Sequence, residues 1–167
     1  MTTDELEIYI YFHLAKLGTY LCFEVMMPFD FLPNNRMNNE RVDLLTYNTK
    51  GEWRFYELKV SVSDFHSKAK KTFYGNFNYF VMPRSVYEKV KNEIPDGIGC
   101  YIVDDNYHFI ESVKKAKCMK FAGNEDSLKK AFTQSLSRQH FQLMSVRREN
   151  LRKRPWMQTE IEMEGTK

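Results

Sequence analysis

The chain has 167 residues, a length that suits one domain with a full hydrophobic core, and its composition of 43% hydrophobic and 28% charged residues is ordinary for a soluble globular protein. The net charge of +3 does not by itself indicate a nucleic-acid-binding protein, and no apolar run is long enough to cross a bilayer. The N-terminus is acidic, unlike the basic start of a signal peptide. Three widely separated cysteines, Cys22, Cys100 and Cys118, argue against a disulfide framework and a zinc cluster, so we expect reduced side chains in a cytoplasmic protein.

The first elements are a predicted helix and strand. Thr2, Thr3 and Asp4 can cap a helix whose apolar residues recur at three- and four-residue steps up to Leu17, and Gly18 is placed to end it. Residues 19–26 are rich in β-branched and aromatic side chains and predict a strand. Residues 28–39 contain two prolines and four asparagines, which predicts a loop.

The middle of the chain predicts a hairpin followed by a helix. Residues 41–47 and 52–60 read as strands joined by a short polar turn that ends in Gly51. Residues 61–76 have helical spacing, with Ser63 or Asp64 as the N-cap.

The rest of the chain alternates short elements before one long helix. We predict a strand at 79–82, a helix at 85–94, paired strands at 99–103 and 107–113, and a helical stretch at 125–151 with room for one break. Helices on both faces of a mixed sheet give an α/β sandwich, with one domain at 1–151 and a C-terminal tail at 152–167.

Basic residues gather near the end of the long helix: Arg147, Arg148, Arg152, Lys153 and Arg154. Such a run is typical of a solvated helix end, and a phosphate-binding patch is the less common alternative that needs a supporting site.

Three residues of the predicted hairpin carry the candidate chemistry. Glu57 and Lys59 are two apart on a strand and therefore point to the same face, near the strand end where α/β sheets commonly build ligand sites. The hairpin lets Asp43, embedded in an apolar strand, lie across from Glu57. Two carboxylates about 4 Å apart repel by about 4 kcal/mol at an effective dielectric near 20, so a buried pair needs a shared proton or a cation. Oxygen ligands favour Mg²⁺ or Mn²⁺, and Lys59 would orient a nucleophile or neutralise developing charge. The alternative is a solvated acid at Asp43 and a surface ion pair between Glu57 and Lys59.

This pattern resembles the PD-(D/E)XK nuclease superfamily, and within it the MmcB-like DNA-repair branch. The match runs over about residues 5 to 145 and includes Glu57-Leu58-Lys59-Val60-Ser61, then Asp64-Phe65, then Lys70 and Tyr74. Val42 stands where the superfamily motif has proline, and the family tryptophan near Lys70 is absent. The resemblance implies a restriction-endonuclease-like mixed sheet flanked by helices.

Site roles follow from the resemblance. It implies metal binding by Asp43 and Glu57, catalysis by Lys59, and a further metal ligand on the first helix. Glu5 and Glu7 both qualify for that position, and Glu7 suits an inward-facing place better, although either acid also suits the positive end of a helix. DNA contacts are predicted for Lys68, Lys70, Lys71 and Tyr74, and for Lys70 and Tyr74 a solvated lysine and a packed tyrosine are the equal alternative.

We therefore expect a Mg²⁺- or Mn²⁺-dependent endonuclease that hydrolyses phosphodiester bonds in DNA, in DNA repair, recombination or phage DNA metabolism. A non-catalytic DNA- or protein-binding module on the same fold is the alternative. A homodimer would supply two sites for cutting both strands, and the sequence leaves the oligomeric state open. No membrane partner is expected.

Overall fold

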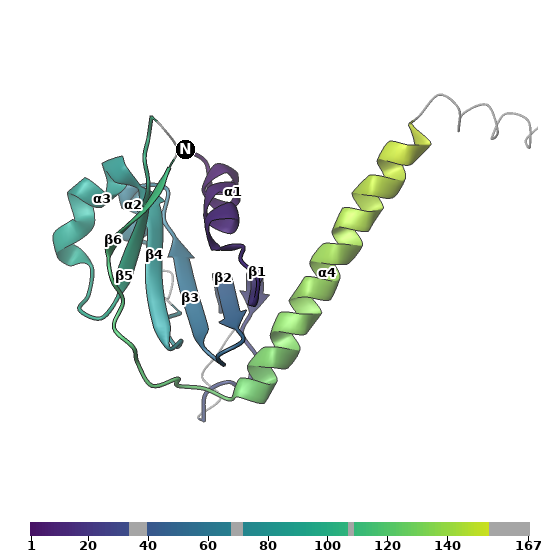
Figure 1. Ribbon diagram of the computed structural model, residues 1–167, viewed down its shortest axis with the longest axis horizontal. Coiled ribbons are helices and arrows are strands. Elements are labelled where there is room, and N and C mark those ends of the chain that lie inside the picture. Colours follow the sequence, from purple (N-terminus) through teal and green to yellow (C-terminus); the bar gives the residue numbers. More distant parts are fainter. Residues whose placement is uncertain (34–39, 68–71, 107–108, 154–167) are drawn as a thin grey trace, which may run out of the picture.

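The computed structural model describes residues 1–33, 40–67, 72–106 and 109–153 (Figure 1). Its helices are α1 (Thr3–Leu14), α2 (Val62–Phe65), α3 (Arg84–Val90), the 3-10 turn η1 (Lys91–Glu93) and α4 (Glu125–Arg152). Its strands are β1 (Thr19–Met26), β2 (Arg41–Asn48), β3 (Trp53–Leu58), β4 (Phe77–Pro83), β5 (Gly99–Val103) and β6 (Ile110–Lys114).

The six strands form one mixed sheet in sequence order. The β1–β2, β2–β3 and β5–β6 pairs are antiparallel, whereas β3, β4 and β5 run parallel to one another. The parallel pairs require crossovers, which contain α2 after β3 and α3 after β4. The expected α/β class, a mixed sheet flanked by helices, is confirmed.

Each face of the sheet has its own core. On one face, Leu6 and Ile10 of α1 pack with Leu44, Tyr56 and Val81. Full burial of one such aliphatic side chain stabilises the fold by about 1.5–3 kcal/mol.

The other face carries two separate clusters. Leu128 and Phe132 of α4 join Phe55 and Leu45 over the β1–β3 half. A second cluster, formed by α2, α3, β4 and β5, includes Phe80. Glu57 follows Phe55 by two residues on β3 and pairs in register with Phe80 on β4, so it lies between the two clusters.

Several predicted boundaries are wrong. The first helix ends at Leu14, three residues before Leu17, which is fully exposed, and Gly18 has a φ of 80° in the turn that follows. The capping prediction is confirmed, because Thr2 and Glu5 form a capping box.

The predicted helix at 61–76 is also wrong. Within the described residues it is helical only at α2, and Ser61, not Ser63 or Asp64, is its N-cap. After residue 71 the chain is not helical, because Gly75 approaches β3 so closely that a Cβ there would lie 2.6 Å from the Phe55 ring and 2.8 Å from the Trp53 carbonyl. Tertiary packing against β3 overrides the helical spacing.

The remaining elements differ mainly in their ends. The hairpin of β2 and β3 and the pairing of β5 with β6 are confirmed, although Tyr107 and His108 lie outside the described residues. The long helix is unbroken from Glu125 to Arg152, begins at the Asn124 N-cap, and follows the β1 edge before projecting beyond the sheet (Figure 1). Residues 154–167 of the predicted tail lie outside the described residues. Among the described helices, none combines the length and apolarity needed to cross a membrane.

Candidate functional site

The β2–β3 hairpin places Asp43 and Glu57 across from each other. The last ladder pair in this direction is Leu44 with Tyr56, and the next step of that register joins Asp43 to Glu57. Beyond this point the acceptor is a side chain and no longer a backbone carbonyl. The Leu58 N–H donates to Asp43 Oδ2 at 2.8 Å. Asp43 is therefore oriented by the strand that carries Glu57.

Glu57 is buried and held by one neighbour. The residue is only 4% exposed. Its Oε1 accepts two hydrogen bonds from Thr72, one from the backbone N–H at 2.9 Å and one from the hydroxyl at 2.6 Å. Two donors on one oxygen fix the orientation of the carboxylate, which leaves Oε2 directed elsewhere.

Lys59 places a buried positive charge against these acids. Its residue is 6% exposed, and its Nζ lies 3.5 Å from Glu57 Oε2 and 3.9 Å from Asp64 Oδ1. Asp64 is itself fixed, since its Oδ2 accepts the Val60 N–H at 3.1 Å. The structure thus brings Asp43, Glu57 and Lys59 together, and the expected alternative of a surface Glu57–Lys59 pair is excluded by burial.

Burial and the charge of Glu57 raise the pKa of Asp43 from its ordinary 3.8 to about 6. The Leu58 N–H and the Lys59 ammonium lower it, but they do not offset the other two effects. At neutral pH the site holds an ionised carboxylate that costs free energy, which is the condition that a bound cation relieves.

Glu7 lies on α1 beside the same group of acids. Burial, followed by the charges of Glu24, Asp4 and Asp43, raises its pKa, while Arg41 lowers it. Glu5, the other candidate on this helix, is committed to the capping box. Glu7 faces a hollow of about 490 Å³ at the β1 edge, whose lining also includes Glu24, Arg41, Arg138 and Gln139.

Glu24 is a further acid close to Glu7 and Asp43, and it is not among the site residues predicted from the sequence. It has a φ of 53°, a left-handed conformation that costs a non-glycine residue roughly 1–2 kcal/mol. Its side chain pairs with Arg41, and its carbonyl accepts a hydrogen bond from Arg138 at 3.0 Å. A charged residue inside the apolar run of β1 was the signal that could have drawn attention to it.

Thr72 and Asp64 also act at the site without having been predicted there. The sequence indicates Asp64 as a helix cap and as part of the family match but not as a partner of Lys59, because the distance to Lys59 depends on how the short α2 turns the chain. Thr72 lies 15 residues from Glu57, and no local pattern indicates its contact.

The oxygens of the site suit a hard divalent cation of the Mg²⁺ or Mn²⁺ type. Among the described residues, Asp43 Oδ1 accepts no hydrogen bond, and Glu57 Oε2 meets only the Lys59 ammonium. No group of three or more His, Cys, Asp or Glu within the described part of the chain is arranged to hold a metal ion, so Glu7 does not complete a set with Asp43 and Glu57. Mg²⁺ is commonly bound by one or two carboxylates together with water and substrate phosphates, so the two acids fit it.

The four predicted DNA-binding residues are Lys68, Lys70, Lys71 and Tyr74. Lys68, Lys70 and Lys71 lie outside the described residues. Tyr74 is not on a helix, so the expected face shared with Lys70 is wrong. Its ring packs against Phe31 and Phe55, with centroid distances of 5.6 and 6.4 Å, which matches the packed alternative.

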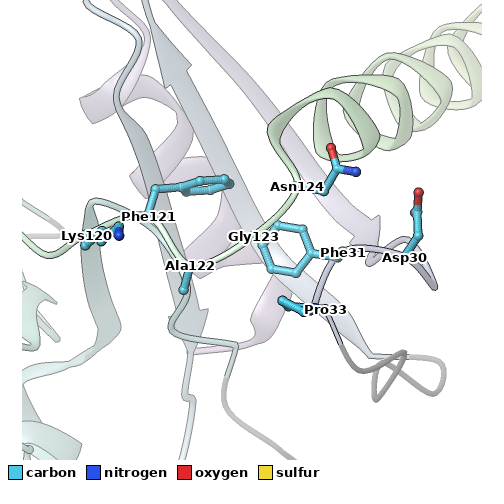
Figure 2. Close-up of a pocket in the computed structure, with 8 residues that line it drawn as sticks. All are labelled: Asp30, Phe31, Pro33, Lys120, Phe121, Ala122, Gly123 and Asn124. Carbon is cyan, nitrogen blue, oxygen red and sulfur yellow. The ribbon is translucent and has the colours of Figure 1, made fainter.

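A larger hollow of about 710 Å³ lies at the start of α4 (Figure 2). Its floor is aromatic, with the Phe31 and Phe121 rings on either side of Gly123. Two of its polar side chains already serve the fold, since Asn124 caps α4 and Asp30 accepts the Ser127 hydroxyl at 2.6 Å. Asp43, Glu57 and Lys59 do not line it, and we regard it as a structural feature of the loop junction.

No known family and no curated relative matches the chain. Among solved structures it is similar to SPO1766, a protein of unknown function from Silicibacter pomeroyi, with a TM-score of 0.65 and 20% identity over 88% of this chain and 92% of that one. At this level of identity the similarity shows the fold alone.

Proposed function

We propose that the chain is a metal-dependent nuclease that hydrolyses phosphodiester bonds in DNA, in line with its resemblance to the PD-(D/E)XK superfamily. The observation that carries this proposal is the convergence of Asp43, Glu57 and Lys59 in a buried place between two core clusters. A lysine buried against two carboxylates is costly to maintain for stability alone, because desolvation offsets most of the attraction.

Asp43 and Glu57 would hold the cation, which when bound polarises the scissile phosphate and lowers the pKa of a water molecule. Thr72 keeps the Glu57 carboxylate in one orientation, and the Leu58 N–H does the same for Asp43. These bonds prepare the oxygens before substrate arrives, so little reorganisation accompanies the reaction.

Lys59 would act on the phosphate. Its ammonium is fixed between Glu57 and Asp64, and it would neutralise negative charge that grows on the oxygens of a phosphate bound against it. Water is largely excluded there, so the interaction is stronger than on the surface.

A second function is favoured by one observation, namely that two acids, not three, would bind the cation among the described residues. A non-catalytic DNA- or protein-binding module could retain such a site without cutting. It would bind its partner equally well in Mg²⁺ and in chelator.

The test is incubation with supercoiled, linear and branched DNA in Mg²⁺, in Mn²⁺ and in chelator. We expect metal-dependent cutting that is lost in Glu57→Gln and Lys59→Met. The matched control is Glu52→Gln, at a partly exposed acid in the turn between β2 and β3 that binds Asn48 and Arg54. Cutting by both site variants at the rate of the control would exclude the proposal.

Two further expectations belong to this proposal. Double-strand cutting by a chain with one site calls for a homodimer, which sedimentation can measure. We expect this activity in the cytoplasm, in keeping with the free thiols of Cys22, Cys100 and Cys118.

A further inference from the structure

The distal half of α4 is exposed to solvent within the described part of the chain. Every residue from 141 to 153 is exposed, and Phe141 is 72% exposed. In Figure 1 this part of α4 projects beyond the sheet and beyond α1. A helix without packing on any side is marginal in water, so this half of α4 calls for a partner.

Its charges are unbalanced and positive. Lys153 is paired with Glu149 at 2.9 Å, whereas Arg147, Arg148 and Arg152 have no acidic partner within ion-pair distance among the described residues. Guanidinium groups are planar, permanently charged and suited to binding phosphate oxygens in pairs.

The same helix also reaches the hollow at the β1 edge. Arg138, further back on α4, lines the hollow that also contains Glu7 and Arg41, and its guanidinium is bonded to the Glu24 carbonyl. From Arg138 to Arg152 the helix rises about 21 Å at 1.5 Å per residue. That length corresponds to about six base pairs at 3.4 Å each.

We propose that the free end of α4, residues 141–153, binds duplex DNA by its phosphates and holds it beside the hollow at the β1 edge. This inference rests on the proposed function, and it names double-stranded DNA as the substrate class. A helix about 10–12 Å across also matches a major groove about 12 Å wide, which single strands do not offer.

A second copy of the chain is the rival occupant, because Met144 and Leu151 are exposed together with Phe141 on this half of α4. The unpaired arginines disfavour it, since two such helices brought together would repel each other.

The test measures binding of the full chain to a DNA duplex by fluorescence anisotropy in chelator, over salt concentrations from about 50 to 200 mM. A plot of log affinity against log salt has a negative slope. We expect the magnitude of this slope to decrease by about 3 in the variant Arg147→Gln/Arg148→Gln/Arg152→Gln, at about 0.9 per lost phosphate contact. The control Lys16→Gln/Lys89→Gln/Lys115→Gln removes the same charge from exposed positions away from α4 and should leave the slope unchanged.

Equal slopes for the two triple variants would overturn the inference. So would a dimer in sedimentation that is lost in Phe141→Ser while DNA binding is unaffected. Binding in chelator is measured without cutting, so failure of this inference can be distinguished from failure of the proposed nuclease function. Arginine-dependent binding without any cleavage would refute the nuclease function and leave the DNA-binding role of α4 standing. Cleavage together with arginine-independent binding would refute the role of α4 and leave the nuclease function standing.

Discussion

Replacing Asp43 with asparagine should make the protein more stable at neutral pH. A pKa raised from 3.8 to about 6 means that keeping this carboxylate ionised costs the fold about 3 kcal/mol. Asparagine removes the charge and keeps an oxygen for the Leu58 N–H, although a neutral acceptor is weaker by about 1 kcal/mol. The net gain expected for Asp43→Asn at about pH 8 is therefore about 2 kcal/mol, or about 4–8 °C in Tm.

The sign follows from linkage. Because the pKa is higher in the folded state than in the unfolded state, stability falls as the pH rises from about 4 to about 6, and the full cost is present above that range. The gain in Asp43→Asn should therefore disappear near pH 4, where the native aspartate is protonated, as urea unfolding at the two pH values will show.

The control is Asp96→Asn, an exposed carboxylate whose pKa is lowered by Lys117. Its removal should destabilise the protein slightly at pH 8 and not at low pH, the opposite trend. If Asp43→Asn is less stable than the parent chain at about pH 8, or more stable by the same amount at both pH values, the electrostatic reasoning about Asp43 is refuted.

Four other predictions follow from the same contacts. Lys59→Met leaves the buried Glu57 charge without its cation and should cost about 3–5 kcal/mol in urea unfolding, part of which Glu57→Gln should restore in the double variant; additive losses would contradict the pairing. Glu24→Gly should be more stable than Glu24→Ala by about 1–2 kcal/mol, because only glycine accepts the left-handed backbone without strain, and equal stabilities would show that no strain is present. Gly123→Ala places a methyl group onto the Phe31 ring and should cost about 1–3 kcal/mol while DNA cutting by the folded protein is retained; loss of cutting without loss of stability would implicate the larger hollow in function. Affinity for Mn²⁺ should increase as the pH rises through about 6, because a proton on Asp43 competes with the cation in the metal-free protein, and an affinity that is constant from about pH 5 to 8 would remove Asp43 from the cation site.

The sheet and the hairpin could be predicted from the sequence because their signals are local. Alternating apolar residues and the turn before Gly51 define β2 and β3, and the register then brings Asp43 opposite Glu57. The two-residue spacing of Glu57 and Lys59 correctly predicted a shared face.

The parts that could not be predicted depend on long-range contacts. Residues 61–76 have helical spacing, yet Gly75 brings the chain against β3 and Thr72 turns to Glu57. Likewise, Leu17 continues the apolar pattern of α1, but the helix ends before it. In each case a competing tertiary contact or turn decided the conformation, and the local pattern did not contain it.

The central claim is that Asp43 and Glu57 share one divalent cation, and Mn²⁺ binding followed by electron paramagnetic resonance tests it most directly. We predict one Mn²⁺ per chain in the parent protein and in the control Glu52→Gln, and none in Asp43→Asn/Glu57→Gln. Unchanged Mn²⁺ binding in that double variant, or no binding by the parent protein, would contradict the account.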